Sequence, residues 1–160
     1  MIDKRAIIED GAIIEENVEI GAYAYIGSKV TIKSGTKIMH HATIEGKTTI
    51  GHDNTIFPYA SIGTAPQDLK YNGEDTELII GNRNKIREFT LINTGTIQDN
   101  GKTIIGDDNL FMGYVHVAHD CVIGNRCIFA NAATLAGHVH VDDAAVVGGM
   151  TPIHQFVHIG

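Results

Sequence analysis

The feature of this sequence that most constrains its fold is a strict period of six residues. From Ile2 to Ile62, every sixth residue is an isoleucine. The residue four positions later is usually small, as at Ala6, Val18 and Ala24. An α-helix repeats every 3.6 residues and a β-strand every two, so neither explains this spacing. The pattern is typical of hexapeptide repeats, in which each repeat supplies one short strand and one corner of a triangular parallel β-helix.

This architecture predicts which residues become neighbours. Three hexapeptides, about 18 residues, complete one coil, and the next coil stacks at the spacing of paired strands, about 4.8 Å. Residues about 18 positions apart should therefore lie next to each other. We expect the periodic residues from Ile2 to Ile62 and from Ile105 to Ile159 to point into one core.

Two segments interrupt the repeat. The register resumes at Ile80 and, after a shift by one residue, continues from Ile105. The segments from Thr64 to about Leu78 and from Gln98 to Thr103 are polar and rich in turn-forming residues. We therefore predict two loops that project from corners of the prism. Loops on a rigid scaffold often carry ligand contacts, although surface insertions without a function fit the composition equally well.

Length and composition narrow the functional classes. The chain of 160 residues corresponds to one ordinary domain. No apolar run approaches the roughly 18 residues of a membrane span, and the N-terminus lacks the apolar stretch of a signal peptide, so we expect a cytoplasmic protein without a membrane segment. The net charge of −7 argues against nucleic acid as a partner. The last repeat begins at Ile159 without a cap, so we expect residues 1–160 to be a single domain that is cut short.

Histidines gather in the second half of the chain, and the 18-residue repeat relates several of them. Counting 18 residues from His119 leads to Gly137, which His138 follows directly. These three residues should therefore stack on neighbouring coils. His116 lies just before His119, so we expect imidazole rings to line one groove.

Three interpretations of this groove remain open at the level of the residues. A neutral imidazole such as His119 can act as a general base, and the Gly137 N–H could face a developing oxyanion. Asp120 could orient the base, although adjacent residues of a strand point to opposite sides. Alternatively, the histidines bind zinc between subunits, as in the gamma-class carbonic anhydrases. In the third interpretation they are exposed residues of a β face without a role.

Other reactive side chains have simpler explanations. Cys121 and Cys127 occupy the small inward position of their repeats, so both are expected to fill the core. A buried thiol away from positive charge stays protonated, which argues against a covalent cysteine mechanism. Arg83, Lys85 and Arg87 alternate along one strand, and solvated surface charge is favoured there over a phosphate site.

Several stretches resemble the UDP-N-acetylglucosamine acyltransferases that begin lipid A biosynthesis, a group of the hexapeptide-repeat acyltransferases. The stretches are Pro66–Tyr71 with Gly73–Glu74, Ile86–Glu88, His116–Cys121, Leu135–His138, Gly148–Met150 and His154–Phe156. The resemblance extends over the whole chain. It also implies the left-handed sense of the β-helix, which the period alone does not determine because ordinary crossovers are right-handed.

The resemblance implies a role for each candidate site residue. His119 would be the general base that activates the 3-hydroxyl of the sugar, with Asp120 beside it. Gly137 would donate its N–H to the thioester carbonyl of acyl carrier protein, and a thioester needs no acyl-enzyme, metal or other cofactor. Substrate binding would fall to Asp68, Lys70, His116, His138, His154 and Gln155. Family members place this site between the subunits of a homotrimer, so a homotrimer is expected.

Two departures from the family pattern keep alternatives open. The segment Ile92–Thr96 contains Asn-Thr where the family commonly has His-Arg, so the acceptor sugar is not defined. The final coils and the C-terminal helical domain of the family are absent. N-acylation of a 3-amino UDP-sugar, a zinc-dependent hydratase and a non-catalytic trimeric scaffold are therefore the alternatives to O-acyl transfer.

Overall fold

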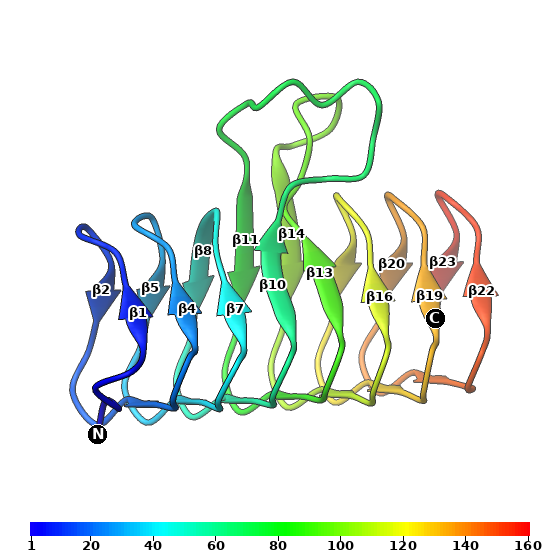
Figure 1. Ribbon diagram of the computed structural model, residues 1–160. Helices are drawn as coiled ribbons and strands as arrows, with labels where there is room; N and C mark the ends of the chain where they lie inside the picture. The colour runs from blue at the N-terminus through cyan, green and yellow to red at the C-terminus, as the bar shows by residue number, and fades with distance from the viewer.

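The computed structural model describes residues 1–160 as a prism of stacked coils (Figure 1). The chain forms 23 short strands and no helix, so no helix is present that could cross a membrane. Each coil contributes one strand to each of three parallel sheets. The architecture is a left-handed parallel β-helix, which confirms both the β-helix predicted from the hexapeptide repeat and the left-handed sense that the resemblance implied.

The three sheets are the three faces of the prism. Sheet 1 contains β1 (Ile7–Ile8), β4 (Tyr25–Ile26), β7 (Thr43–Ile44), β10 (Ser61–Thr64), β13 (Leu91–Asn93), β16 (His116–Val117), β19 (Thr134–Leu135) and β22 (Pro152–Ile153). Sheet 2 contains β2 (Ile13–Ile14), β5 (Thr31–Ile32), β8 (Lys47–Ile50), β11 (Glu77–Ile80), β14 (Lys102–Ile105), β17 (Val122–Ile123), β20 (His140–Val141) and β23 (His158–Ile159). Sheet 3 contains β3 (Glu19–Ile20), β6 (Lys37–Ile38), β9 (Thr55–Ile56), β12 (Lys85–Ile86), β15 (Leu110–Phe111), β18 (Ile128–Phe129) and β21 (Val146–Val147).

The periodic aliphatic residues fill the interior, as predicted, except at the ends. Ile26 and Ile50 are fully buried, and burying each such side chain contributes roughly 2 kcal/mol. Ile2, in contrast, is 49% exposed, and Ile8 and Ile159 are only partly buried. Ile2 still pairs with the buried Ile20 in the stack, so its exposure arises because the terminal coil is covered on one side only.

A ladder of buried asparagines lies inside the corner between sheets 2 and 3. Asn54, Asn84 and Asn109 occupy the small inward position and are at most 2% exposed. The Asn84 side chain donates to the Gly106 carbonyl at 2.9 Å, and its Oδ1 accepts the Asn109 N–H at 2.9 Å. Each amide thus satisfies backbone groups that the corner leaves unpaired.

Both interruptions of the repeat are projecting loops, as predicted, although the second loop begins before Gln98 and Thr103 belongs to β14. The first loop, residues 65–76, joins β10 to β11, and the second loop, residues 94–101, joins β13 to β14. Both loops connect sheet 1 to sheet 2, so they leave the prism at the same corner (Figure 1). The insertions lengthen the stretch of sequence between stacked strands. Ile7 pairs with Tyr25, 18 residues later, whereas Ser61 pairs with Leu91 and Leu91 with His116, which are further apart in sequence. The loops therefore lie beside the turns of the coils that follow.

Candidate active site

The candidate site lies in the turns between sheets 1 and 2, next to the two loops. His119 and Asp120 lie between β16 and β17, and Gly137 and His138 lie one coil further on, between β19 and β20. The two turns are in contact, since the His138 N–H donates to the His119 carbonyl at 3.1 Å. The coil geometry thus brings together His119, Gly137 and His138, the three residues that the 18-residue spacing relates.

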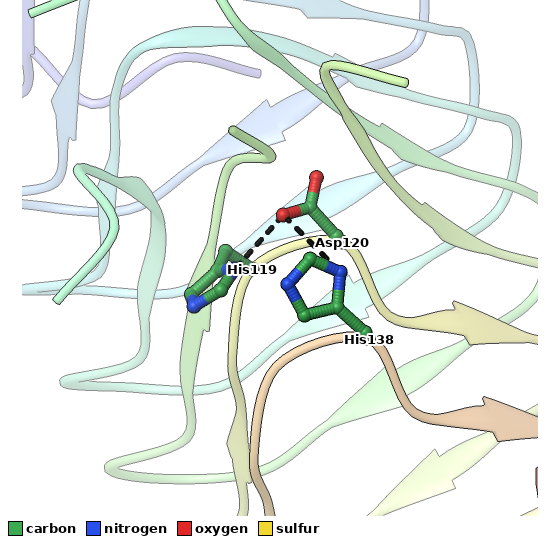
Figure 2. A group of neighbouring side chains, drawn as sticks. All are labelled: His119, Asp120 and His138. Carbon is green, nitrogen blue, oxygen red and sulfur yellow. Dashed lines mark hydrogen bonds and ion pairs between the residues drawn. The ribbon is translucent and has the colours of Figure 1, made fainter. Parts of the chain in front are cut away.

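His119 and Asp120 form a direct contact at the centre of this corner. His119 Nδ1 lies 2.8 Å from Asp120 Oδ2 (Figure 2). The expectation that these neighbours point to opposite sides is wrong, because they lie in a turn and not in a strand. Asp120 has a φ of 61°, a left-handed conformation that turns its side chain back toward His119.

The Asp120 carboxylate is buried and well satisfied. It is 2% exposed, and it accepts the Thr96 N–H at Oδ1 (2.8 Å) and the Thr96 hydroxyl at Oδ2 (2.6 Å). A carboxylate accepts hydrogen bonds only, so in the neutral ring of His119 the proton lies on Nδ1 and the free lone pair on Nε2. Thr96 was not predicted, because only the path of the second loop brings it to Asp120.

Gly137 makes room for the His119 ring. A Cβ atom at Gly137 would lie 2.5 Å from Cε1 and 2.7 Å from Nε2 of His119, closer than real Cβ contacts. Any larger residue would therefore displace the imidazole. In addition, no group of the protein accepts the Gly137 N–H, which leaves this donor available to a ligand.

His138 is the second imidazole of the corner. Its ring lies 5.0 Å from the His119 ring in an edge-on arrangement and stacks on Phe156 at 4.5 Å. Its Nδ1 lies 2.8 Å from Asp99 Oδ2 and 3.9 Å from Asp120 Oδ2. The hydrogen bond from this ring holds the pKa of Asp99 below its usual range. Neither Asp99 nor Phe156 was predicted to be a site residue, although Phe156 lies 18 residues after His138.

Asp68 reaches this centre from the first loop. Asp68 Oδ2 lies 3.9 Å from His119 Nε2, on the side of the ring away from Asp120. Its Oδ1 accepts the Lys70 N–H at 2.9 Å, and Lys70 is an exposed residue. The first loop thus adds a carboxylate beside the free nitrogen of His119.

The remaining predicted residues make no hydrogen bond to the His119–Asp120 pair. His116 is half-buried on β16, its Nδ1 lies 3.3 Å from the Leu91 carbonyl oxygen, and burial lowers its pKa. His154 and Gln155 are exposed on the next coil, beside Ala136 and Gly137. The expected groove of several imidazoles therefore has only the rings of His119 and His138 in mutual contact.

The geometry also bears on the competing interpretations. The ligand atoms of His119, Asp120 and His138 lie within 4.8 Å of one another, so these side chains could enclose an ion. Cys121 is fully buried, as predicted, and burial raises its pKa to about 12. A cavity of about 260 Å³ lies beneath the first loop, but none of the histidines lines it.

The basic side chains of the third sheet are surface groups. Arg83 pairs with Asp108 at 2.8 Å, and Arg87 pairs with Glu88 at 2.8 Å. Lys85 on β12 is exposed. Since both arginines are already paired with carboxylates, the arrangement agrees with solvated surface charge.

Comparison with known proteins gives a consistent result. Residues 102–137 match the bacterial transferase hexapeptide (six repeats) family. Over 159 residues the chain is 66% identical to the acyl-[acyl-carrier-protein]--UDP-N-acetylglucosamine O-acyltransferase of Aliarcobacter butzleri, covering 99% of this chain and 61% of that relative. The chain therefore spans about three fifths of the length of this curated relative.

Solved structures agree with this similarity. The UDP-N-acetylglucosamine acyltransferase from Campylobacter jejuni is 47% identical with a TM-score of 0.95, covering 99% of this chain and 62% of that one. The UDP-N-acetylglucosamine acyltransferase from Bacteroides fragilis is 44% identical with a TM-score of 0.89, covering 100% of this chain and 67% of that one. Because sequence and backbone agree over the whole chain, the chain belongs to the UDP-N-acetylglucosamine acyltransferase family.

Proposed function

We propose that this chain transfers an acyl group, such as a 3-hydroxyacyl chain, from acyl carrier protein to the 3-hydroxyl of UDP-N-acetylglucosamine, the first step of lipid A biosynthesis. The observation that carries the proposal is the buried His119–Asp120 pair, whose ring lies over Gly137. The name of the Aliarcobacter butzleri relative describes the same donor and acceptor.

His119 is the general base in this proposal. Its Nδ1–H is held by Asp120, so Nε2 takes the proton of the sugar hydroxyl as the oxygen attacks the thioester carbonyl. The C–O bond forms, and the C–S bond then breaks. The departing thiolate recovers the proton from His119. Asp120 stabilises the transient imidazolium without taking the proton, because it accepts hydrogen bonds from both His119 and Thr96.

Gly137 stabilises the oxyanion that forms during this attack. Its N–H has no acceptor within the protein, so a ligand oxygen can receive it. A preorganised donor of this kind contributes on the order of a hundred- to a thousand-fold in rate. The thioester is already activated, so direct attack is sufficient and no acyl-enzyme is required.

Substrate binding involves the first loop and a neighbouring copy of the chain. Asp68, 3.9 Å from His119 Nε2, is placed to hold the sugar beside the base, and Lys70 provides a cation for the phosphates. His116, His138, His154 and Gln155 complete the groove. The exposure of Lys70, His154 and Gln155 fits a site that an adjacent subunit closes, as expected for a homotrimer.

The test replaces His119 with Ala in the complete gene product and measures transfer from acyl carrier protein to the sugar. Turnover should fall by about a hundred- to ten-thousand-fold, with an unchanged oligomeric state. Asp120→Ala should cost less, since it orients the base. His158→Ala, an exposed histidine paired with Asp142, is the matched control. Near-normal turnover of the His119→Ala protein would overturn the mechanism.

Two further measurements separate the alternatives. Product analysis with the 3-hydroxy and the 3-amino sugar as acceptors distinguishes O-acylation from N-acylation. The cluster of His119, Asp120 and His138 makes zinc worth measuring directly. We expect no stoichiometric zinc in purified protein. Stoichiometric zinc that is lost with the His119→Ala change would favour the hydratase instead.

A further inference from the structure

The second loop holds a carboxylate against His138. Asp99 Oδ2 lies 2.8 Å from His138 Nδ1, although the two residues are 39 positions apart. The other oxygen of Asp99 accepts the Asn100 N–H at 2.8 Å. The Thr96 carbonyl accepts the N–H groups of both Asp99 and Gly101. The turn that carries Asp99 is therefore tied to Thr96, the residue that also binds Asp120.

Packing alone fixes only the plane of the His138 ring. The ring stacks on Phe156 with an interplanar angle of 6° and meets the His119 ring edge-on at 86°, and its side chain is 14% exposed. Such contacts constrain the plane, but they do not distinguish a ring nitrogen from a ring carbon. Rotation of the ring by half a turn would keep the stacking and exchange the positions of nitrogen and carbon. A directional hydrogen bond is needed to select one orientation.

We propose that Asp99 is a positioning residue that selects both the ring orientation and the tautomer of His138. With Nδ1–H donated to Asp99, the neutral ring carries its free lone pair on Nε2. Figure 2 shows this second nitrogen on the side of the ring that faces His119. Asp120 Oδ2 lies 3.9 Å from His138 Nδ1, too far for a hydrogen bond, so Asp99 is the carboxylate that selects the orientation.

The consequence concerns the acceptor substrate and rests on the proposed function. His138 Nε2 would accept a hydrogen bond from a hydroxyl of the sugar, beside the hydroxyl that His119 deprotonates. Each histidine then has its own carboxylate and its own task. His119, held by Asp120, is the general base, and His138, held by Asp99, orients the substrate. The pKa of Asp99, held low by the hydrogen bond from His138, is consistent with an ionised partner.

The first experiment records long-range proton–nitrogen NMR correlations of histidine-labelled protein at mildly alkaline pH. His138 should be protonated at Nδ1 in the parent chain. Asp99→Ala should shift the ring toward the Nε2–H tautomer that free histidine prefers. Asp99→Asn should restore Nδ1–H, since the amide oxygen still accepts. Asp142→Ala is the matched control, because it removes an exposed carboxylate 2.9 Å from a different ring, His158.

The second experiment measures acyl transfer by the complete gene product. Asp99→Ala should raise the KM for the sugar by about three- to tenfold, the effect of one lost hydrogen bond, with a smaller change in kcat. Asp99→Asn and Asp142→Ala should remain close to the parent. An unchanged His138 tautomer in Asp99→Ala would overturn the inference. If the parent protein lacked transfer activity, the proposed function would fail while the NMR result would still decide the role of Asp99.

Discussion

Gly137 offers the sharpest test of how the site is built. The Cβ atom of an alanine there would lie 2.5, 2.7 and 3.0 Å from Cε1, Nε2 and Nδ1 of His119. Carbon atoms in contact normally stay about 3.5–4.0 Å apart, so the imidazole must move by roughly 1 Å. The ring is the end of a side chain in a turn, so it can move without disturbing the core. Its 2.8 Å hydrogen bond to Asp120 would not survive such a shift.

The magnitude follows from that displacement. A misplacement of about 1 Å in a reacting group costs on the order of a hundredfold in rate. Gly137→Ala should therefore lower kcat by about a hundredfold with little change in Tm, measured by steady-state acyl transfer and thermal unfolding. Gly148→Ala is the matched control, because the nearest atom to its added Cβ lies at an ordinary 3.5 Å.

A double mutant separates this explanation from others. In a His119→Ala background there is no ring to displace, so adding Gly137→Ala should cost little more. A full additional loss would mean that the added methyl group acts independently of the ring, by blocking the approach of the thioester to the Gly137 N–H. Parent-like kcat in Gly137→Ala, or a His119 ring unmoved in its crystal structure, would refute the steric argument.

Three further predictions concern stability and reactivity. Asn84→Ala leaves the Gly106 carbonyl and the Asn109 N–H without a partner. The free energy of unfolding, measured in urea, should therefore fall by about 2–5 kcal/mol. Asn72→Ala, at an exposed position, should change this free energy little. The Cys121 thiol has a pKa of about 12, so it should resist a thiol reagent in the native protein and react once the protein is unfolded. Rapid labelling of Cys121 in the native protein would contradict its burial. Burial lowers the pKa of His116 from 6.5, so below about pH 6.5 the unfolded chain binds a proton that the folded chain does not. The free energy of unfolding should therefore fall as the pH drops below that value. The His116→Gln protein should show a shallower fall of this free energy with pH. Equal slopes in the two proteins would exclude His116 as a contributor.

Much of the architecture could be predicted because position along a solenoid follows almost directly from residue number. Each coil takes about 18 residues, so the period of the isoleucines was enough to predict the core. In the same way, the spacing from His119 to Gly137 was enough to predict that the two residues lie on neighbouring coils. The same arithmetic predicts Phe156 beside His138, a neighbour that only the structure brought to attention. Wherever the period is unbroken, the sequence determines which residues are adjacent.

The tertiary structure decided what the period does not describe. Asp120 contacts His119 because its side chain bends back across the turn, a side-chain direction that the spacing of the isoleucines does not give. Thr96 and Asp99 reach the site because the second loop folds back over the next coils, along a path that no repeat specifies. The repeat therefore positions the two histidines and places a left-handed residue at every sixth position of the later coils, including Asp120. The second loop, which lies outside the repeat, supplies Thr96 and Asp99, because a loop without the period follows a backbone path that the residue spacing does not specify.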